Sequence, residues 1–311
     1  HPPHRWRLGP NRWLDLSRTA VMAILNLTPD SFSDGGSYPT VEAAVEAAAA
    51  AVRDGADSLD LGGESTRPGA PRVEAAEQIR RVVPVIQAIR ARGGPLATIP
   101  ITVDTTRAEV AAAALDAGAD AINDVSAGLE DPAMLPLAAT RGVGVILMHR
   151  LRPPGEDCYS DQYRKDPVYA GGVVAAVREF LAGRAAAAEA AGVAREAIVL
   201  DPGLGFGKTV EQNLELVRRT GEIAALGYPV LSGLSRKSFV GRAGGHSPDD
   251  PPRERVAATV GLSVAHLLAG ASIFRVHDVA LHVRALRAAA AAWGISERRA
   301  REGTAAPGGR G

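Results

Sequence analysis

Short apolar runs of strand length alternate with amphipathic segments along most of the chain. The first run, Val21 to Leu25, ends at the polar Asn26, and a polar loop separates it from a helical pattern over 41–53. Apolar residues in that pattern recur at three- and four-residue spacing, which is typical of a helix with one buried face. The region therefore predicts one unit of strand, loop and helix.

The same unit recurs eight times. The predicted strands are residues 21–25, 58–62, 100–104, 121–124, 144–149, 197–201, 229–235 and 272–277. The predicted helices are residues 41–53, 73–92, 108–117, 131–141, 173–190, 210–226, 256–268 and 279–293. The strands are short, apolar and rich in β-branched residues, as parallel strands buried on both faces should be. Eight units favour a single-domain α/β fold, a (β/α)8 TIM barrel over residues 20–293, with a doubly wound open sheet as the alternative.

Segments outside these units are mostly polar. Residues 1–19 are irregular apart from Trp6 and Trp13, and we expect them to form an N-terminal tail. Residues 242–253 are rich in Gly, Pro and Asp, which predicts a surface excursion. Residues 294–311 are polar and rich in Gly and Ala, so we expect a disordered C-terminal tail.

Composition narrows the classes of partner. The chain has 311 residues, 46% of them hydrophobic and 23% charged, and a formal net charge of +0. This balance argues against nucleic acid or a membrane surface as the main partner, because both attract proteins with a basic excess. The single cysteine, Cys158, excludes an internal disulfide and favours a cytoplasmic location. No apolar run is long enough to span a bilayer.

Polar residues close nearly every predicted strand. In a TIM barrel the carboxyl ends of the strands meet on one rim, where catalytic groups lie. A single polar strand end is usually a helix cap or a turn residue, whereas a set that converges on one rim favours a functional site. The set comprises Asn26, Ser65-Thr66-Arg67 after Gly62, Asp104, Asn123, Asp201, Lys237, Arg275 and His277, with Met148 at the end of the fifth strand.

The chemistry of these side chains falls into two groups. Asp104, Asn123 and Asp201 supply hydrogen-bond acceptors that suit a flat heterocycle with several N–H groups, such as a pterin. A second group is cationic and suits a phosphate or a diphosphate. It consists of Arg67, Lys237, Arg275 and His277. For Arg275 and His277 a salt bridge on the rim is the alternative interpretation.

Two further motifs concern metal and phosphate chemistry. Asn26 and the acidic loop after it could hold Mg²⁺, which takes few protein ligands and keeps waters and phosphate oxygens. The run from Gly203 to Lys208 suggests a P-loop, but it has one residue too few between its first glycine and the Gly-Lys pair. We therefore interpret it as a Gly-rich floor beneath a flat ring, with Phe206 beside that ring.

Several of these segments together resemble the signatures of the dihydropteroate synthase family, the folate-pathway enzymes that sulfonamides inhibit. The resemblance extends over most of the chain, and its motifs occur in the family's order. The segments that carry it are 26–36 (NLTPDSFSDGG), 60–70 (DLGGESTRPGA), 103–105 (VDT), 122–126 (INDVS), 200–208 (LDPGLGFGK), 235–237 (SRK) and 275–277 (RVH).

The resemblance implies a TIM barrel, often a homodimer, that joins p-aminobenzoate to 6-hydroxymethyl-7,8-dihydropterin diphosphate by an SN1-like path. The products are 7,8-dihydropteroate and pyrophosphate. By the matched motifs, the pterin is held by Asp104, Asn123, Asp201 and Lys237, with Met148 and Phe206 lining its slot. Asn26 binds Mg²⁺, and the diphosphate is held by Arg67, Arg275 and His277. The p-aminobenzoate pocket is formed by Thr66, Arg67, Pro68 and Ser235.

One region departs from the family's pattern, and two other functions stay open. The family usually has a Gly-x-Pro…Met-Gln loop after the fifth strand, whereas this chain has a different polar loop, Arg150 to Pro167. A pterin-binding methyltransferase barrel would share the pterin contacts but would have no use for a diphosphate site. A catalytically silent pterin-binding paralogue would not need to keep the loops after the first two strands.

Overall fold

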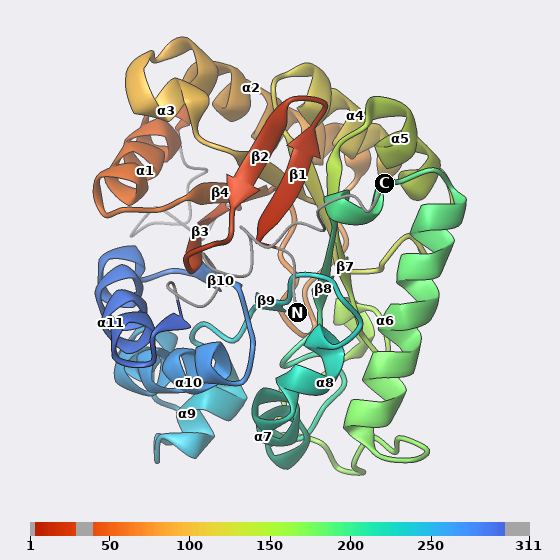
Figure 1. The fold of residues 1–311 in the computed structure, drawn as a ribbon, viewed down its shortest axis with the longest axis vertical. Helices are drawn as coiled ribbons and strands as arrows, with labels where there is room; N and C mark the ends of the chain where they lie inside the picture. Colours follow the sequence, from red (N-terminus) through yellow and green to blue (C-terminus); the bar gives the residue numbers. More distant parts are fainter. Residues whose placement is uncertain (1–3, 29–39, 296–311) are drawn as a thin grey trace, which may run out of the picture.

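The computed structural model describes residues 4–28 and 40–295. Eight parallel strands form a barrel, and helices surround it on the outside (Figure 1). The strands are β3 (Ala20–Asn26), β4 (Ser58–Gly62), β5 (Ile101–Asp104), β6 (Ala121–Asp124), β7 (Gly144–Met148), β8 (Ile198–Asp201), β9 (Leu231–Ser232) and β10 (Ile273–Val276). Their order is β8-β7-β6-β5-β4-β3-β10-β9, and a parallel bridge between Leu200 and Val230 joins the two ends. The predicted TIM barrel is confirmed.

Each barrel strand is followed by at least one helix. The helices are α1 (Val41–Arg53), α2 (Ala75–Ala91), α3 (Gly94–Thr98), α4 (Ala108–Asp116), α5 (Met134–Arg141), α6 (Val173–Ala190), α7 (Val210–Arg218), α8 (Thr220–Ala224), α9 (Ser238–Ala243), α10 (Val256–Leu268) and α11 (Val279–Ala292). A helix occurs in each predicted region, and the short helices α3 and α9 are additions.

Three details differ from the prediction. The strand expected over 229–235 contains only the two residues of β9. The helix expected over 210–226 is broken at Arg219, whose backbone angles of φ −107° and ψ 19° leave the helical region. The excursion expected over 242–253 begins with the end of α9 and leads into a 3₁₀ turn at Pro252–Arg255.

The expectation of an irregular N-terminal tail over residues 1–19 is wrong. Strands β1 (Arg5–Gly9) and β2 (Arg12–Asp15) form an antiparallel hairpin, drawn in red in Figure 1. The hairpin closes the amino-terminal end of the barrel, because its apolar side chains pack with inward-facing residues of the barrel strands. That cluster comprises Trp6, Leu8, Leu14, Leu16, Ala20, Met22, Ala121, Ile146, Val199, Leu231 and Ile273.

Trp6 is the centre of this closure. Its side chain is fully buried, and its indole N–H donates to the carbonyl oxygen of Ala197 at 2.8 Å. A Cβ on Gly144 would lie 2.9 Å from the indole ring, so only glycine at the start of β7 allows the ring to approach this closely. An indole buries a large apolar area and needs a partner for its N–H, and both conditions are met here.

Alternation along the strands separates an outer core from the barrel interior. Leu59 and Leu61 of β4 belong to the large cluster between the barrel and its helices, so Ser58 and Asp60 take the opposite face. The same parity places apolar side chains at the closed end and polar ones at the carboxyl end. The inward positions at the carboxyl end include Asn26, Asp60, Asp104, Asn123, Met148, Asp201 and Arg275.

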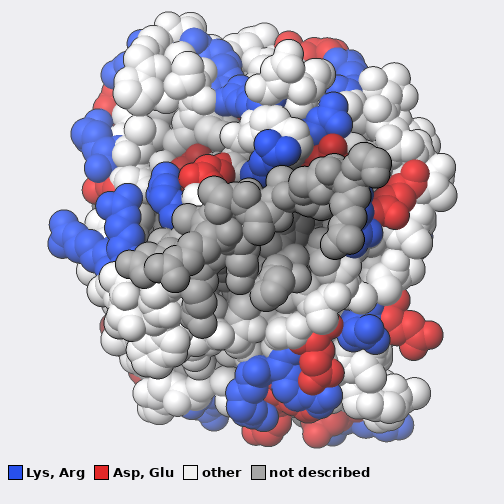
Figure 2. Space-filling model, viewed as in Figure 1, with Lys and Arg blue, Asp and Glu red and all other residues white. Residues whose placement is uncertain are grey.

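Three further observations bear on the sequence predictions. The acidic loop after Asn26 and most of the predicted C-terminal tail lie outside the described residues, which end at the buried Ile295. Within the described ranges, no helix is both long and apolar enough to cross a bilayer. On the face shown in Figure 2, Lys and Arg are interspersed with Asp and Glu.

Candidate active site

Strand register brings the predicted pterin-binding side chains onto one rim. Asp104 on β5 is paired with Asn123 on β6, and Gly62 on β4 is paired with Asp104 from the other side. Further round the barrel, Met148 on β7 is paired with Asp201 on β8. Because the four larger residues share an inward parity, their side chains enter the same end of the barrel.

A buried ionic network joins the acidic and cationic groups. Arg275 on β10 donates from Nε to Oδ2 of Asp60 at 2.5 Å and from Nη2 to Oδ2 of Asp104 at 2.8 Å. Asn123 donates from Nδ2 to the same oxygen of Asp60 at 3.1 Å, and Thr102 donates to its other oxygen. A salt bridge was the alternative interpretation of Arg275 from the sequence. Arg275 does form one, but it lies inside the site.

The sequence analysis missed Asp60 as a site residue. It is fully buried in the middle of β4, and Arg275, Asn123 and Thr102 converge on its carboxylate. A signal was present in the sequence, because an aspartate between two leucines in a buried strand faces the barrel interior. Asp60 is not at a strand end, but it belongs to the site because the long side chain of Arg275 extends to it.

Burial and charge oppose each other in this network. Burial raises the pKa of Asp104 to about 7, Arg275 acts against that rise, and Asp60 adds to it. Arg275 keeps its charge: burial acts against that charge, but the attraction of Asp60 and Asp104 outweighs burial and raises its pKa. A carboxyl whose pKa lies near neutrality inside a cleft is typical of a binding or catalytic site.

Asp201 and Lys237 form a second charged group on the rim. A Cβ built on Gly233 would lie 3.4 Å from Oδ2 of Asp201 and 3.9 Å from Nζ of Lys237, so the two charged ends flank that glycine. Burial raises the pKa of Asp201 and lowers the pKa of Lys237 to about 8, while each residue opposes the other's shift. The pair offers one acceptor and one donor to a ring that enters the barrel mouth.

Residues 202–208, which we call the floor loop, support this second group. The N–H of Gly203 donates to Oδ1 of Asp201 at 2.7 Å. The ammonium of Lys237 lies 4.3 Å from the centre of the Phe206 ring and donates to the carbonyl of Leu204. Phe206 also packs with Met148 and Val125 in a small apolar cluster, so the two residues expected to line the pterin slot lie together.

Lys208 holds the floor loop from within the protein. Its side chain is fully buried, and its ammonium donates to the carbonyls of Gly203 and Phe206 at 2.9 and 2.8 Å and lies 3.0 Å from Nδ1 of His149. Burial lowers its pKa to about 7. A lysine bound to backbone carbonyls in this way does not reach for a nucleotide phosphate, which agrees with the rejection of a P-loop.

Ser235 and His277 meet beyond the ends of β9 and β10. Nδ1 of His277 lies 2.9 Å from Oγ of Ser235, and that oxygen accepts the backbone N–H of His277 at 3.2 Å. The serine can donate its own proton to Nδ1, and in that arrangement the ring proton is on Nε2. Burial, with Arg236 and Arg275 nearby, lowers the pKa of His277 to about 3, so the ring is neutral at pH 7.

Arg236 shapes the turn that presents Ser235 and Lys237. Its φ of +60° is in the left-handed region, which is uncommon for a residue with a Cβ. Its guanidinium donates to both oxygens of Asp278, at 2.9 and 2.5 Å, and Arg255 donates to its carbonyl at 3.1 Å. These contacts stabilise a backbone conformation that has one predicted site residue on each side of Arg236.

The second loop, residues 63–74 between β4 and α2, is hydrogen-bonded near both ends. Oε1 of Glu64 accepts the N–H of Val73 at 2.7 Å, and the N–H of Gly69 donates to the carbonyl of Pro154 at 2.9 Å. Between these bonds lie the half-buried Thr66 and Pro68 and the exposed Arg67. Among the described residues, the structure does not bring the Arg67 side chain into the network of Arg275.

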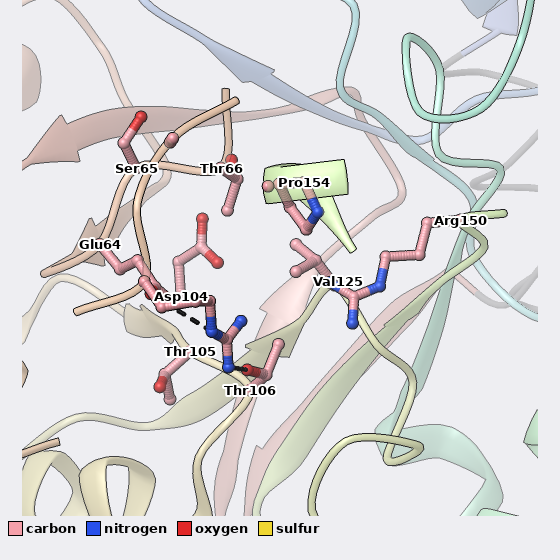
Figure 3. Close-up of a pocket in the computed structure, with 12 residues that line it drawn as sticks. Glu64, Ser65, Thr66, Asp104, Thr105, Thr106, Val125, Arg150 and Pro154 are labelled. Carbon is pink, nitrogen blue, oxygen red and sulfur yellow. Dashed lines mark hydrogen bonds and ion pairs between the residues drawn. The ribbon is translucent and has the colours of Figure 1, made fainter. Parts of the chain in front are cut away.

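A small open hollow lies beside Asp104, under the second loop (Figure 3). Figure 3 shows the Asp104 carboxylate pointing into it, with Thr66 above and the Arg150 guanidinium approaching from the other side. Glu130 accepts a hydrogen bond from Arg72 at 2.9 Å and a further one from Arg150. The sequence analysis assigned no role to these three residues, whose charges tie the second loop to the loop after β7.

Asn26 is the predicted ligand of Mg²⁺. It is half-buried at the carboxyl end of β3 and is paired with Gly62. Within the part of the chain that the structure describes, no group of three or more His, Cys, Asp or Glu residues could hold a metal ion. One amide oxygen, together with waters and diphosphate oxygens, is nevertheless a donor set that Mg²⁺ accepts. The described residues therefore fit an ion carried by a diphosphate.

Comparison with known proteins identifies what this chain is similar to. A family model described as pterin binding enzyme matches residues 22–277. The chain is 43% identical to the dihydropteroate synthase of a Synechocystis strain over 277 residues, which are 89% of this chain and 91% of that protein.

Solved structures give the same result. The dihydropteroate synthase of Xanthomonas albilineans with 4-aminobenzoic acid has a TM-score of 0.81 and 42% identity, over 93% of this chain and 98% of that one. The same enzyme in complex with 7,8-dihydropteroate has a TM-score of 0.79 and 40% identity, over 93% and 98% of the two chains. Both the fold and the sequence are thus shared over nearly the whole length.

Proposed function

The chain belongs to the dihydropteroate synthase family of pterin-binding enzymes, and from this membership we propose how its rim residues carry out the family's reaction. The enzyme is a transferase of folate biosynthesis. It joins the methylene carbon of 6-hydroxymethyl-7,8-dihydropterin diphosphate to the amine of p-aminobenzoate and releases pyrophosphate. The observation that carries the assignment of the site is the convergence of Asp104, Asn123, Asp201 and Arg275 inside one end of the barrel.

The pterin ring lies between the two charged groups of the rim. Oδ2 of Asp201 accepts ring N–H groups, because Oδ1 is already bonded to Gly203. Lys237 donates to a ring acceptor from the side of Phe206. Asp104 and Asn123 bind the opposite edge of the ring. A ring without these donors would leave buried polar groups unpaired, and this gives the slot its selectivity.

The diphosphate lies near β10 and the second loop. The two bonds of Arg275 to Asp60 and Asp104 use two of its five N–H groups, and the others can bind phosphate oxygens. When Ser235 donates to Nδ1 of His277, Nε2 carries a proton that it can donate to a phosphate oxygen. Arg67 is exposed on the second loop, so its long side chain can turn toward an anion bound at this place.

Mg²⁺ belongs to this diphosphate subsite. Asn26 would supply the protein ligand, and the bound ion would stabilise negative charge on the departing pyrophosphate. The residues of the chain orient the ring, hold the leaving group and keep the methylene carbon facing the p-aminobenzoate pocket. A partial positive charge at that carbon can spread into the electron-rich ring, so the bond to the diphosphate can break early.

No general base is needed for the attack. The arylamine of p-aminobenzoate is neutral at pH 7, and its lone pair forms the new C–N bond while the C–O bond to the diphosphate breaks. The extra proton on nitrogen is released to water or to pyrophosphate. Thr66 and Pro68 on the second loop and Ser235 beyond β9 form the walls of the p-aminobenzoate pocket. This pocket spans β3 and β10, which lie between β4 and β9 in the barrel.

Steady-state release of pyrophosphate tests the function directly. Release should require both the pterin diphosphate and p-aminobenzoate, and 7,8-dihydropteroate should form in equal amount. Neither alternative function predicts this: a methyltransferase barrel would not release pyrophosphate, and a silent paralogue would bind pterin without turnover. Binding of pterin without any release, in a well-folded preparation, would contradict the proposal.

A homodimer and a cytoplasmic location stay predictions. The first rests on the family resemblance, and analytical ultracentrifugation at micromolar concentration would test it by measuring the mass in solution. The second rests on cysteine usage. Cys158 is a free cysteine in the structure, and burial raises the pKa of its thiol, which makes the thiol less reactive at neutral pH.

A further inference from the structure

The connection between β7 and α6, residues 149–172, lies against the floor loop. We call it the fifth loop, and it contains the segment in which the sequence departs from the family's pattern. His149, at its start, lies against Lys208. Further along, its side chains contact the floor loop directly at Gly207, and at Gly205 through Asn213 of α7. Neither glycine was given a role in the site described above.

The contact at Gly207 is direct and tight. The N–H of Gly207 donates to Oδ2 of Asp157 at 2.7 Å, and its carbonyl accepts the hydroxyl of Tyr169 at 2.6 Å. Gly207 has φ +67°, and a Cβ there would lie 2.4 Å from Cβ of Leu151. The backbone of Gly207 is thus held on both of its polar groups, and the fifth loop leaves no space for a side chain.

Asp157 is itself fixed by the fifth loop. Its side chain is buried, and its other oxygen, Oδ1, accepts the hydroxyl of Tyr163 at 2.6 Å and the N–H of Cys158 at 3.0 Å. These two bonds fix the orientation of the carboxylate that accepts the Gly207 N–H. Hydrogen bonds to a carboxylate are stronger than those between neutral groups.

The second contact runs through Asn213 near the start of α7. Its Oδ1 accepts the N–H of Gly205 at 2.6 Å, and its Nδ2 donates to Oγ of Ser160 at 3.0 Å. Asn213 is fully buried and Ser160 nearly so, which excludes water as a competing partner. The fifth loop therefore fixes the floor loop at two glycines, on either side of Phe206.

The floor loop in turn positions the side chains that form the pterin slot. Gly203 orients Asp201, the carbonyl of Leu204 holds Lys237, and Phe206 lies beside the ammonium of Lys237. A displacement at Gly207 moves Phe206 directly and shifts the carbonyl that Lys208 binds. A shift of this kind at a positioning residue weakens binding at the slot without removing any group that touches the ligand.

We propose that Asp157 and Tyr169 are positioning residues for the pterin slot, acting on Asp201, Lys237 and Phe206 through the N–H and the carbonyl of Gly207. The inference rests on the proposed function, because it names the pterin as the ligand that senses the position of the floor loop. Asp157 and Tyr169 do not touch the substrate, and the carboxylate of Asp157 is supplied by the segment that departs from the family's pattern.

The test compares two tyrosines whose hydroxyl groups bind different partners. Tyr169→Phe removes only the hydroxyl that binds Gly207, whereas Tyr163→Phe removes an equivalent hydroxyl that binds the far oxygen of Asp157. Asp157→Ala removes the acceptor of the Gly207 N–H as well. Affinity for 6-hydroxymethyl-7,8-dihydropterin diphosphate is measured by calorimetric titration, and KM for p-aminobenzoate is measured at saturating pterin diphosphate.

We expect Tyr169→Phe to weaken pterin binding about fivefold, and Asp157→Ala about tenfold or more, since one neutral and one charge-assisted hydrogen bond are lost. KM for p-aminobenzoate should stay within about twofold. Tyr163→Phe should bind pterin nearly as tightly as the wild type, because the N–H of Cys158 still holds Oδ1 of Asp157. Hydrogen exchange of the Gly207 amide should quicken in Asp157→Ala but not in Tyr163→Phe.

Three outcomes would overturn the inference. In the first, Tyr169→Phe and Asp157→Ala bind pterin as tightly as the wild type. In the second, Tyr163→Phe loses as much affinity and thermal stability as Tyr169→Phe, which would make the fifth loop a general stabilising element. In the third, the wild type binds no pterin, which would overturn the proposed function first, whereas exchange at Gly207 would still report whether Asp157 holds the loop.

Discussion

Nη2 of Arg275 lies 2.8 Å from Oδ2 of Asp104, and this ion pair joins the proposed pterin-binding and diphosphate-binding halves of the site. Asp104 comes from β5 and Arg275 from β10, and β4 and β3 separate those strands in the barrel. Only a long inward side chain can cross that distance. The protonation state of Asp104 should therefore affect the binding of both the pterin ring and the diphosphate of the same substrate, because the two subsites share one buried network.

The first prediction concerns pH. Asp104 must be ionised to accept ring N–H groups, and its pKa of about 7 means that this capacity is lost as the pH falls below 7. Lys237 must be protonated to act as a cation, and its pKa of about 8 means that the charge is lost as the pH rises above 8. We expect kcat/KM for the pterin diphosphate to be bell-shaped, with its maximum between these values.

The control for the pH profile is Asp104→Asn. This variant should be less active at every pH, and its profile should lack the decline on the acid side, because the amide does not titrate. The same substrate is used for both proteins, so ionisation of its phosphates affects both profiles equally. An unchanged acid limb in Asp104→Asn would assign that limb to another group.

The second prediction concerns Asp201→Asn. An amide that keeps the bond from Gly203 to its oxygen would turn its NH₂ toward the ring, so a donor would face the ring's donors. Truncating one partner of a buried, charge-assisted pair costs about 2–5 kcal/mol, so pterin affinity should fall by about 30-fold or more. Calorimetric titration with the pterin diphosphate measures this loss.

Stability serves as the control for Asp201→Asn. Burial raises the pKa of Asp201 above its value in the unfolded chain, so the folded state loses stability as the pH rises through that range. Asparagine does not ionise, so the variant does not lose stability in this way. Its free energy of unfolding at pH 7 should be equal to or higher than that of the wild type. A variant that folds this well and still binds pterin normally would remove Asp201 from the site.

The third prediction concerns Mg²⁺. Turnover should stop in excess chelator and return when Mg²⁺ is added. Asn26→Ala should raise the Mg²⁺ concentration that gives half-maximal activity, because one of the few protein ligands is lost. Glu46→Ala, in the exposed part of α1, is a suitable control that should leave the metal requirement unchanged. Full activity in chelator would take the metal out of the mechanism.

The fourth prediction concerns the order of binding. Arg67 is exposed and lies between the two hydrogen-bonded ends of the second loop, so it can be drawn inward by pyrophosphate bound near Arg275 and His277. We expect p-aminobenzoate to bind about 5- to 150-fold more tightly when pterin, Mg²⁺ and pyrophosphate are present. Arg67→Ala should lose most of that gain, and equal affinity with and without pyrophosphate would refute the coupling.

The fifth prediction concerns stability. Trp6→Ala leaves a cavity at the closed end of the barrel and an unpaired carbonyl at Ala197, and it should lower the free energy of unfolding by about 3–5 kcal/mol. Trp13→Ala is the matched control, because that ring is only half-buried beneath the guanidinium of Arg5. Urea unfolding of both variants measures the difference, and equal losses would show that the hairpin does not close the barrel as described.

Local patterns in the sequence were enough to determine the barrel and much of its rim. Strand length, helical periodicity and recurring loops fix each unit locally, and the parity of a strand decides which side chains face inward. The motifs at the strand ends therefore placed Asp104, Asn123 and Asp201 correctly on one rim. These are properties of short segments, which a sequence displays without knowledge of what lies across the barrel.

Contacts between distant segments were decided only by the tertiary structure. Residues 5–15 carry Trp6, Leu8, Trp13 and Leu14 around a Gly-Pro-Asn turn, but their burial depends on the open end of a barrel that the rest of the chain builds. Asp60 and Arg275 are 215 residues apart, and neither one's local pattern reveals the other. The hydrogen bond from the N–H of Gly207 to Asp157 is also a contact between distant segments. Nothing in the sequence marks Asp157 as the acceptor for that N–H until the fold brings the two together.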